Sequence, residues 1–257
     1  MIAGTEDSDL ATESRVVLIM DADRYVGPAL ALLLAGRGHK LLLHGAGEAL
    51  ASKMEGLGCD FRVVSTQEIP VCGAESVATE AGADRLVDEC LSKYGALDAA
   101  LIRSPNFAQG TLLDVELNAY DRVKTNLDIS FHMLRALVPL MREKRRGDIV
   151  LITSAHAGRP TAQFGIYAAV RAAENVLMRS SALAYAADGV IINAVGTNYM
   201  RFPDFRGGWS DDFEKMRSET PRGQLGTMEE LAELCALLLE GRARHLVGQF
   251  LSFSGGW

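Results

Sequence analysis

Short apolar runs alternate along this chain with longer amphipathic segments. The runs that predict strands lie at 15–20, 40–44, 61–64, 99–102, 149–154, 190–195 and 249–253. Between them, the clearest helical periodicity covers 26–35 and 127–143. Continuous apolar strands separated by helices are typical of a parallel sheet covered on both faces. The pattern therefore predicts an α/β protein with a doubly wound parallel sheet of about seven strands, whose ligands bind at the carboxyl ends of the strands.

The pattern continues without a linker, an internal repeat or a low-complexity tract, so we expect one catalytic domain over 15–257. The first residues are small, polar and acidic, which predicts a disordered tail over 1–14 and argues against a signal peptide. The stretch 65–82 is poorly patterned and is interpreted as a loop followed by a helix start. The stretch 199–218 combines aromatic, glycine and charged residues and predicts a mobile flap.

Charge and cysteine usage exclude several classes of protein. The chain has 33 acidic and 26 Lys or Arg side chains, a net charge of -7, so neither nucleic acid nor an anionic membrane is an expected partner. No apolar run reaches the roughly 18 residues that would span a bilayer. The 4 cysteines show no paired spacing and no histidine partners at metal-ligand spacing. We therefore expect no disulfide framework, no metal site and a cytoplasmic location.

A spaced group of polar residues follows the fifth predicted strand. Ser154 ends that strand, Tyr167 comes thirteen residues later and Arg171 four residues after Tyr167. This resembles the Ser, Tyr, Lys constellation of the short-chain dehydrogenase/reductase superfamily, with Arg in place of Lys. Asn126 matches the superfamily's helix asparagine, and 221–256 resembles its closing pattern. The resemblance runs from residue 15 to residue 257 and implies a single-domain Rossmann-like fold.

The turn after the first strand departs from the superfamily's glycine-rich pattern, Thr-Gly-x-x-x-Gly-x-Gly. Asp21 and Tyr25 stand where the first two glycines belong, and only Gly27 is kept. Those glycines let the backbone approach a pyrophosphate, whereas a tyrosine ring fills space and an aspartate repels phosphates. The second strand ends in Leu43, His44 and Gly45, without an acid or a clear base for the adenosine ribose. NAD or NADP binding is therefore expected to be disfavoured.

Halohydrin dehalogenases resemble the chain at these departures, because they keep the fold, use Ser, Tyr and Arg, and carry an aromatic residue at the second glycine. Their loop Gly-Pro-Asn-Tyr-Leu is similar to residues 196–200 of this chain, although Thr197 replaces the proline and Met20 replaces a usual threonine. The resemblance implies a cofactor-independent lyase that converts a vicinal haloalcohol into an epoxide and halide. The reverse opening of an epoxide by small anions is implied as well.

The reaction needs a base, a hydrogen-bond donor and an anion pocket. Tyr167 would remove the hydroxyl proton, Ser154 would hold the substrate oxygen, and the permanent charge of Arg171 would stabilise the phenolate. The residues expected to line the halide and substrate pocket are Tyr25, Phe107, Gly196, Thr197, Asn198, Tyr199 and Met200. No Gly-x-Ser-x-Gly elbow surrounds Ser154, so His156 is interpreted as a loop residue. Trp257 is expected to cap the core or to reach a neighbouring subunit.

Two other functions remain open at this point. The first is an NAD(P)-dependent short-chain oxidoreductase with a degenerate cofactor turn, using Ser154, Tyr167, Asn126 and Arg171. The second is a non-catalytic, oligomeric binding protein of the same fold, since a fold alone does not fix a function. For any of the three, the superfamily resemblance implies a homotetramer formed by pairing the long helices that carry Asn126 and Tyr167.

Overall fold

The computed structural model describes residues 13–201 and 210–257. Residues 1–12 of the predicted tail and residues 202–209 of the predicted flap lie outside the described residues. Next to the first gap, the Ser14 hydroxyl donates a hydrogen bond to the Gly38 carbonyl at 2.7 Å. Beside the second gap, the flap region forms regular elements, a short strand at Met200–Arg201 and a helix at Ser210–Glu219.

Seven parallel strands form the central sheet in the order β3-β2-β1-β4-β5-β6-β9. Their bounds are β1 (Val16–Ile19), β2 (Lys40–His44), β3 (Phe61–Val64), β4 (Ala99–Arg103), β5 (Gly147–Ser154), β6 (Val190–Thr197) and β9 (Phe250–Phe253). A separate two-stranded sheet pairs β7 (Met200–Arg201) with β8 (Gly226–Thr227). The predicted doubly wound α/β fold is confirmed, and each predicted strand has its counterpart in the central sheet.

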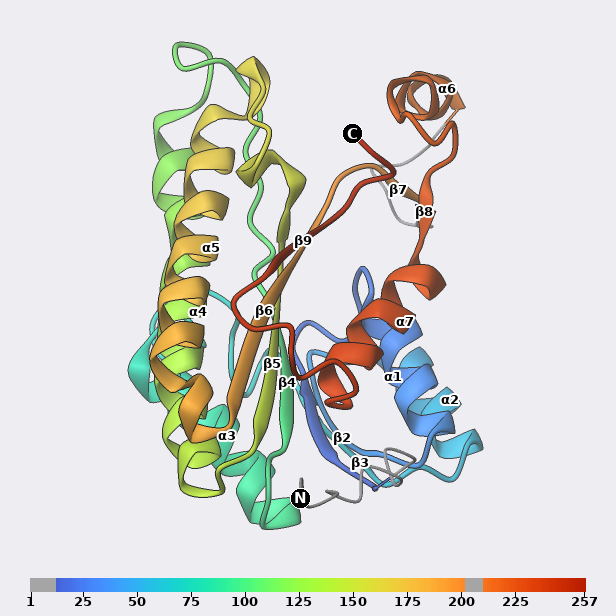
Figure 1. Cartoon of the computed structure of the whole chain (residues 1–257), viewed down its shortest axis with the longest axis vertical. Helices are drawn as coiled ribbons and strands as arrows, with labels where there is room; N and C mark the ends of the chain where they lie inside the picture. The colour runs from blue at the N-terminus through green and yellow to red at the C-terminus, as the bar shows by residue number, and fades with distance from the viewer. Residues whose placement is uncertain (1–12, 202–209) are drawn as a thin grey trace, which may run out of the picture.

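Helices cover both faces of this sheet (Figure 1). They are α1 (Gly27–Gly36), α2 (Glu48–Gly56), α3 (Glu80–Tyr94), α4 (Leu117–Glu143), α5 (Gly165–Tyr185), α6 (Ser210–Glu219) and α7 (Met228–Leu239), with 3-10 turns η1 (Ala155–Ala157), η2 (Ala162–Phe164) and η3 (Ala186–Asp188). The first core packs α3, α4 and α5 on one face, and the second packs α1, α2 and α7 on the other.

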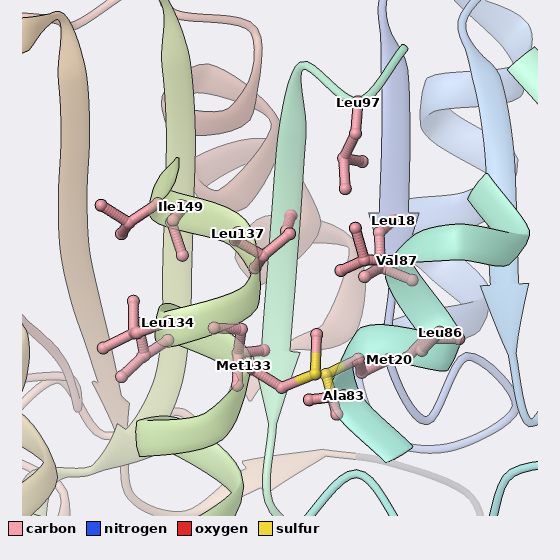
Figure 2. Packing of buried hydrophobic residues seen from close by; sticks show 14 of the residues in the cluster. Leu18, Met20, Ala83, Leu86, Val87, Leu97, Met133, Leu134, Leu137 and Ile149 are labelled. Atoms are coloured by element: carbon pink, nitrogen blue, oxygen red, sulfur yellow. The ribbon is translucent and has the colours of Figure 1, made fainter. Parts of the chain in front are cut away.

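Strand β1 shows why the sheet needs both layers. Leu18 belongs to the core under α3 and α4, whereas its neighbours Val17 and Ile19 belong to the core under α1 and α7. Figure 2 shows Val87 of α3 and Leu137 of α4 beside Leu18. Burying a Val, Leu or Ile side chain fully stabilises the fold by about 1.5–3 kcal/mol, so an apolar residue at every position of the strand favours the two-layer arrangement.

One helix boundary differs from the sequence prediction, and another agrees with it for a reason that periodicity does not give. Helix α4 begins at Leu117, ten residues before the predicted start at 127. Leu117 and Tyr120 point outward and are exposed, so the first turns of α4 lack the apolar stripe that periodicity detects. In the poorly patterned stretch 65–82, helix α3 starts where the Thr79 hydroxyl accepts a hydrogen bond from the Gly82 amide at 3.2 Å. A side chain interaction at the cap, not periodicity, marks this start.

The strand order reverses between β1 and β4, because β1 pairs with β2 on one side and with β4 on the other. This is the position at which doubly wound sheets open a crevice for ligands. The segments that follow β1, β4, β5 and β6 all reach this edge, which is the upper end of the sheet in Figure 1. The predicted site residues lie on these segments.

Candidate active site

Ser154 and Tyr167 are carried to the carboxyl edge by the last residue of β5 and the first turn of α5. Both are buried, with exposed fractions of 3% and 9%. The Ser154 hydroxyl oxygen accepts a hydrogen bond from the backbone amide of His156 at 3.2 Å, which caps the turn η1. Because an O–H can still donate while its oxygen accepts, Ser154 keeps a donor for a ligand. The His156 ring, two residues after Ser154, lies 6.3 Å from the Tyr167 ring. The turn that follows Ser154 is therefore close to Tyr167.

Aromatic rings surround Tyr167. Phe107, from the segment after β4, packs edge-on against Tyr167 with ring centroids 5.1 Å apart. Phe164 lies 5.5 Å from Phe107 and 4.4 Å from His156. Phe164 was not identified from the sequence, because a single aromatic residue before a helix carries no distinctive pattern. The rings give this end of the crevice an apolar wall.

His156 and Trp257 have more definite places than the sequence indicated. His156 lies in a 3-10 turn rather than in an irregular loop, and its ring contacts Trp257 at 4.8 Å. Trp257 therefore packs against its own chain, at the same aromatic cluster, and its ring also lies 6.3 Å from that of Tyr199. Burial lowers the pKa of His156, so its imidazole is neutral at pH 7.

Arg171 is committed to partners that sequence analysis did not identify. Its guanidinium forms a buried ion pair with Glu174 at 2.9 Å and donates to the Ser104 carbonyl at 2.8 Å. The guanidinium carbon lies 5.0 Å from the centre of the Tyr167 ring, over its face. Burial opposes the charged form, but the Glu174 carboxylate outweighs it and raises the pKa of Arg171 above its usual value. Arg171 is thus beside Tyr167 as predicted, with its charge already balanced.

The turn between β1 and α1 keeps a glycine-type backbone without the glycines. Asp21 and Tyr25 both have positive φ, 54° and 55°. These are the two positions where the family pattern has glycine, and a non-glycine residue there costs about 1–2 kcal/mol. Gly27 cannot be replaced in the same way, because a Cβ at this residue would lie 2.4 Å from the Ala22 carbonyl oxygen.

The Tyr25 side chain extends from this turn across the crevice. Its hydroxyl donates a hydrogen bond to the Thr197 hydroxyl at 2.7 Å, at the end of β6. Since β4 and β5 lie between β1 and β6 in the sheet, this bond passes the carboxyl ends of two strands. Burial raises the pKa of Tyr25 above its usual value, so the phenol keeps its proton and remains a donor.

Arg103 is a second cation of the site, half-buried, that the sequence analysis missed. It ends β4, forms an ion pair with Asp21, and lies over the Tyr25 ring at 5.4 Å. The signal available in the sequence was a charged residue directly after the apolar run 99–102. Asp21 therefore has a partner within the protein, in addition to occupying a glycine position.

Asn126 has a structural contact in this chain. Its side chain oxygen accepts from the Asn106 amide at 3.1 Å and its side chain nitrogen donates to the Asn106 carbonyl at 2.8 Å. These two bonds fix the segment after β4, which carries Ser104 and Phe107. Asn126 is fully buried in α4, so it supports the segment after β4 from inside the protein.

The residues 196–200, predicted to line the halide and substrate pocket, each contact a different part of the fold. Gly196 packs against Phe250, because an added Cβ would lie 2.2 Å from that ring. Thr197 contacts Tyr25, and Met200 is buried in the core that includes α7. The Tyr199 hydroxyl donates to Glu219 at 2.9 Å. Asn198 lies between these residues, and its side chain nitrogen is buried without a hydrogen-bond partner among the described residues.

Comparison with known proteins identifies the family. A family model described as enoyl-(acyl carrier protein) reductase matches residues 22–257. The chain belongs to the short-chain dehydrogenase/reductase family. Over 253 residues it is 33% identical to "(2S)-[(R)-hydroxy(phenyl)methyl]succinyl-CoA dehydrogenase subunit BbsC" of Thauera aromatica, with 95% of each chain covered.

Other members of the short-chain dehydrogenase/reductase family match at lower identity. The chain is 26% identical to the 3-oxoacyl-[acyl-carrier-protein] reductase FabG of Staphylococcus aureus (strain N315), over 95% of this chain and 98% of that one. The crystal structure of levodione reductase superimposes with a TM-score of 0.83 at 22% identity, over 95% and 98% of the two chains, which supports the fold. These relatives are named as dehydrogenases or reductases, not dehalogenases. The predicted superfamily is therefore confirmed, and the relatives favour an oxidoreductase over a dehalogenase.

The family implies a nicotinamide dinucleotide, and the residues of this crevice do not fit one. The Tyr25–Thr197 bond crosses the space beside the first turn, and the Asp21 carboxylate lies where phosphates would approach. At the end of β2, His44 is fully buried and bonds through Nε2 to the Ile69 carbonyl at 2.8 Å. His44 therefore offers neither a carboxylate nor a cation to a ribose, and the nearest carboxylate is that of Asp23, beside Gly47. In the described ranges, no group of three or more acidic, His or Cys side chains could hold a metal ion, and no helix is long and apolar enough to cross a membrane.

Proposed function

We propose that this chain is a subunit of a short-chain dehydrogenase/reductase and that it binds the hydroxyl or oxo group of an acyl compound. The observation that carries the proposal is the pair Ser154 and Tyr167, held at the carboxyl edge of a chain that is 33% identical to a named dehydrogenase subunit. The names of the relatives include a succinyl-CoA dehydrogenase subunit and 3-oxoacyl reductases, which favours an acyl substrate.

The two hydroxyls suit a neutral oxygen. An O–H of Ser154 or Tyr167 can donate to a ketone oxygen or accept from an alcohol, because a hydroxyl is both donor and acceptor. Phe107 and Phe164 form an apolar wall beside Tyr167 and keep water away from the reacting oxygen. In such surroundings each hydrogen bond to the substrate is stronger than it would be in water.

A binding measurement on the purified chain tests this proposal. Isothermal titration with acetoacetyl-CoA, a 3-oxoacyl thioester, is expected to show binding that weakens about fivefold in Ser154→Ala and in Tyr167→Phe, since each lost hydrogen bond contributes roughly 1 kcal/mol. Tyr185→Phe, at the opposite end of α5 from Tyr167, is the matched control and should bind as the wild type does. Equal binding by all four proteins, or none by the wild type, would contradict the proposal.

A halohydrin dehalogenase remains the second candidate, favoured by the Tyr25–Thr197 bond and by Arg171 at the usual lysine position. In that reaction Tyr167 would take the proton of a haloalcohol hydroxyl as the ring closes and halide leaves. Titration of free bromide during incubation with a small vicinal bromo-alcohol, without nicotinamide, separates the two functions. Bromide release that is lost in Tyr167→Phe would replace the first proposal by the second.

We also propose that copies of the chain assemble through the outer faces of α4 and α5. These faces expose large apolar side chains, namely Leu117, Tyr120 and Phe131 on α4 and Val176 and Leu183 on α5. Apolar side chains that lie exposed on two neighbouring helices favour an interface. Light scattering is expected to give a tetramer for the wild type and smaller species for Val176→Asp. The same change at an exposed alanine, Ala184→Asp, places the charge one residue from Leu183 and shows how far the interface extends.

A further inference from the structure

Both cations of the crevice have a carboxylate of their own within the chain. Arg103, at the end of β4, pairs with Asp21, and their side chains are 17% and 9% exposed. Arg171, on α5, pairs with Glu174, and their side chains are 5% and 1% exposed. Buried charges are rarely left alone, but here each pair lies at the edge where ligands enter a doubly wound sheet.

Glu174 is held as a fixed counter-ion. Its Oε2 receives a hydrogen bond from Arg171 at 2.9 Å, and its Oε1 receives hydrogen bonds from the hydroxyls of Ser104 at 3.0 Å and Ser130 at 2.7 Å. These donors come from three separate parts of the fold, namely α5, the end of β4 and α4. These donors hold both carboxylate oxygens, so the Glu174 side chain cannot turn away from Arg171.

Two other titratable groups around Tyr167 and Arg103 carry no charge at neutral pH. His156, on η1, is neutral because burial lowers the pKa of its imidazole. Tyr25, on the first turn, keeps its proton because burial raises the pKa of its phenol. The charged groups described here are the two arginines, their two carboxylates and two further arginines nearer the surface: Arg24, 4.0 Å from Asp21, and Arg159, over the Trp257 ring.

We propose that Asp21 and Glu174 are built-in counter-ions that make this crevice selective for an uncharged polar group and exclude anions such as halide or a dinucleotide phosphate. An entering anion would meet a carboxylate beside each cation, and like charges at close range repel strongly where water is scarce. A ketone or alcohol meets no such repulsion and can bond to Ser154 and Tyr167. The selectivity agrees with the first proposed function and would oppose a dehalogenase, whose product is a halide.

Bromide binding tests the counter-ions directly. Thermal unfolding is followed against sodium bromide, with sodium gluconate keeping the ionic strength constant, for the wild type, Asp21→Asn and Glu174→Gln. We expect little stabilisation of the wild type and an apparent bromide affinity at least tenfold higher in each variant, because each has lost a counter-ion beside an arginine. Glu214→Gln is the matched control, since Glu214 pairs with Arg217 at the same three-residue spacing on an exposed helix. It should behave as the wild type does.

The double variant Arg171→Met with Glu174→Met separates counter-ion removal from loosening of the fold. It removes cation and carboxylate together, so bromide affinity should stay at the wild-type level. If Glu174→Gln does not fold, Asp21→Asn alone decides the result. Bromide binding by the wild type as tight as by Asp21→Asn, or an equal gain in the double variant, would overturn the proposal. Neither result depends on acetoacetyl-CoA, so the proposed substrate and the proposed selectivity can fail separately.

Discussion

The two edges of the sheet both contain buried arginine–carboxylate pairs, and the pairs differ in what they connect. At the amino edge, Asp148 of β5 lies 2.7 Å from Arg15 and 3.0 Å from Arg244, which are 133 and 96 residues away in sequence. At the carboxyl edge, Arg171 and Glu174 are three residues apart on one helix. This salt bridge joins two residues of the same helix turn, and the connection of Glu174 to distant segments is made by the hydroxyls of Ser104 and Ser130. At the same edge, the ion pair of Asp21 and Arg103 joins the turn after β1 to the end of β4. The contrast therefore lies between Asp148 and Glu174: the salt bridges of Asp148 themselves join distant segments, whereas we propose that Glu174 adjusts the charge of a site.

Removing Asp148 tests the amino edge and should give the largest effect. Asp148→Ala leaves Arg15 buried without its carboxylate, which should lower the free energy of unfolding by about 3–5 kcal/mol. Denaturant unfolding measures the change. The control is Asp188→Ala, which breaks a more exposed pair with Arg142 and should cost at most about 1 kcal/mol. Equal losses in the two variants would mean that the amino-edge pair does not secure the fold.

Tyr25→Gly tests the carboxyl edge of the sheet. This variant should change ligand binding more than stability. The variant removes the ring that crosses the crevice and gives the positive φ of residue 25 to a glycine, which adopts it without strain. NADPH affinity, measured by its fluorescence on binding, should rise at least tenfold, or about 1.4 kcal/mol. Thr197→Val removes only the hydrogen bond and keeps the ring, so it should leave binding weak. NADPH binding that is equally tight in the wild type would contradict the steric argument.

His44, at the carboxyl end of β2, allows a test of how stability at this edge of the sheet depends on pH. His44, at the carboxyl end, has a lowered pKa because of burial, whereas the unfolded chain takes up this proton near pH 6.5. Stability from neutral His44 is therefore complete above pH 6.5 and decreases as the pH falls, by up to about 1.4 kcal/mol per pH unit. His44→Gln keeps a donor for the Ile69 carbonyl and should flatten the loss between pH 6.5 and 5.5. Unfolding curves with the same slope in both proteins would show that another group causes the acid sensitivity.

The sequence predicted features that depend on neighbours along the chain. Apolar runs located the strands, and the spacing of Ser154, Tyr167 and Arg171 located the site. Glu174 and Arg103 were missed because a counter-ion acquires its meaning only when segments far apart in sequence meet, as Ser104, Ser130 and Glu174 do. A carboxylate on the inward face of a helix, three residues after an arginine, was nevertheless a visible signal.

The smallest effect on stability is expected when both partners of the Arg171–Glu174 pair are replaced together. Replacing both partners of a buried pair by apolar residues of similar size is often neutral, because the desolvation cost of the charges disappears with their attraction. Arg171→Met with Glu174→Met should therefore unfold within about 1 kcal/mol of the wild type, whereas removing Asp148 alone is costly. Denaturant unfolding of the double variant, beside the single variant Arg171→Met, gives the measurement. The single variant leaves the Glu174 carboxyl group buried without its arginine, so it should be clearly less stable than the double variant. If the double variant were as unstable as Asp148→Ala, the carboxyl-edge pair would secure the fold as the amino-edge pair does, and the distinction between the two edges would be lost.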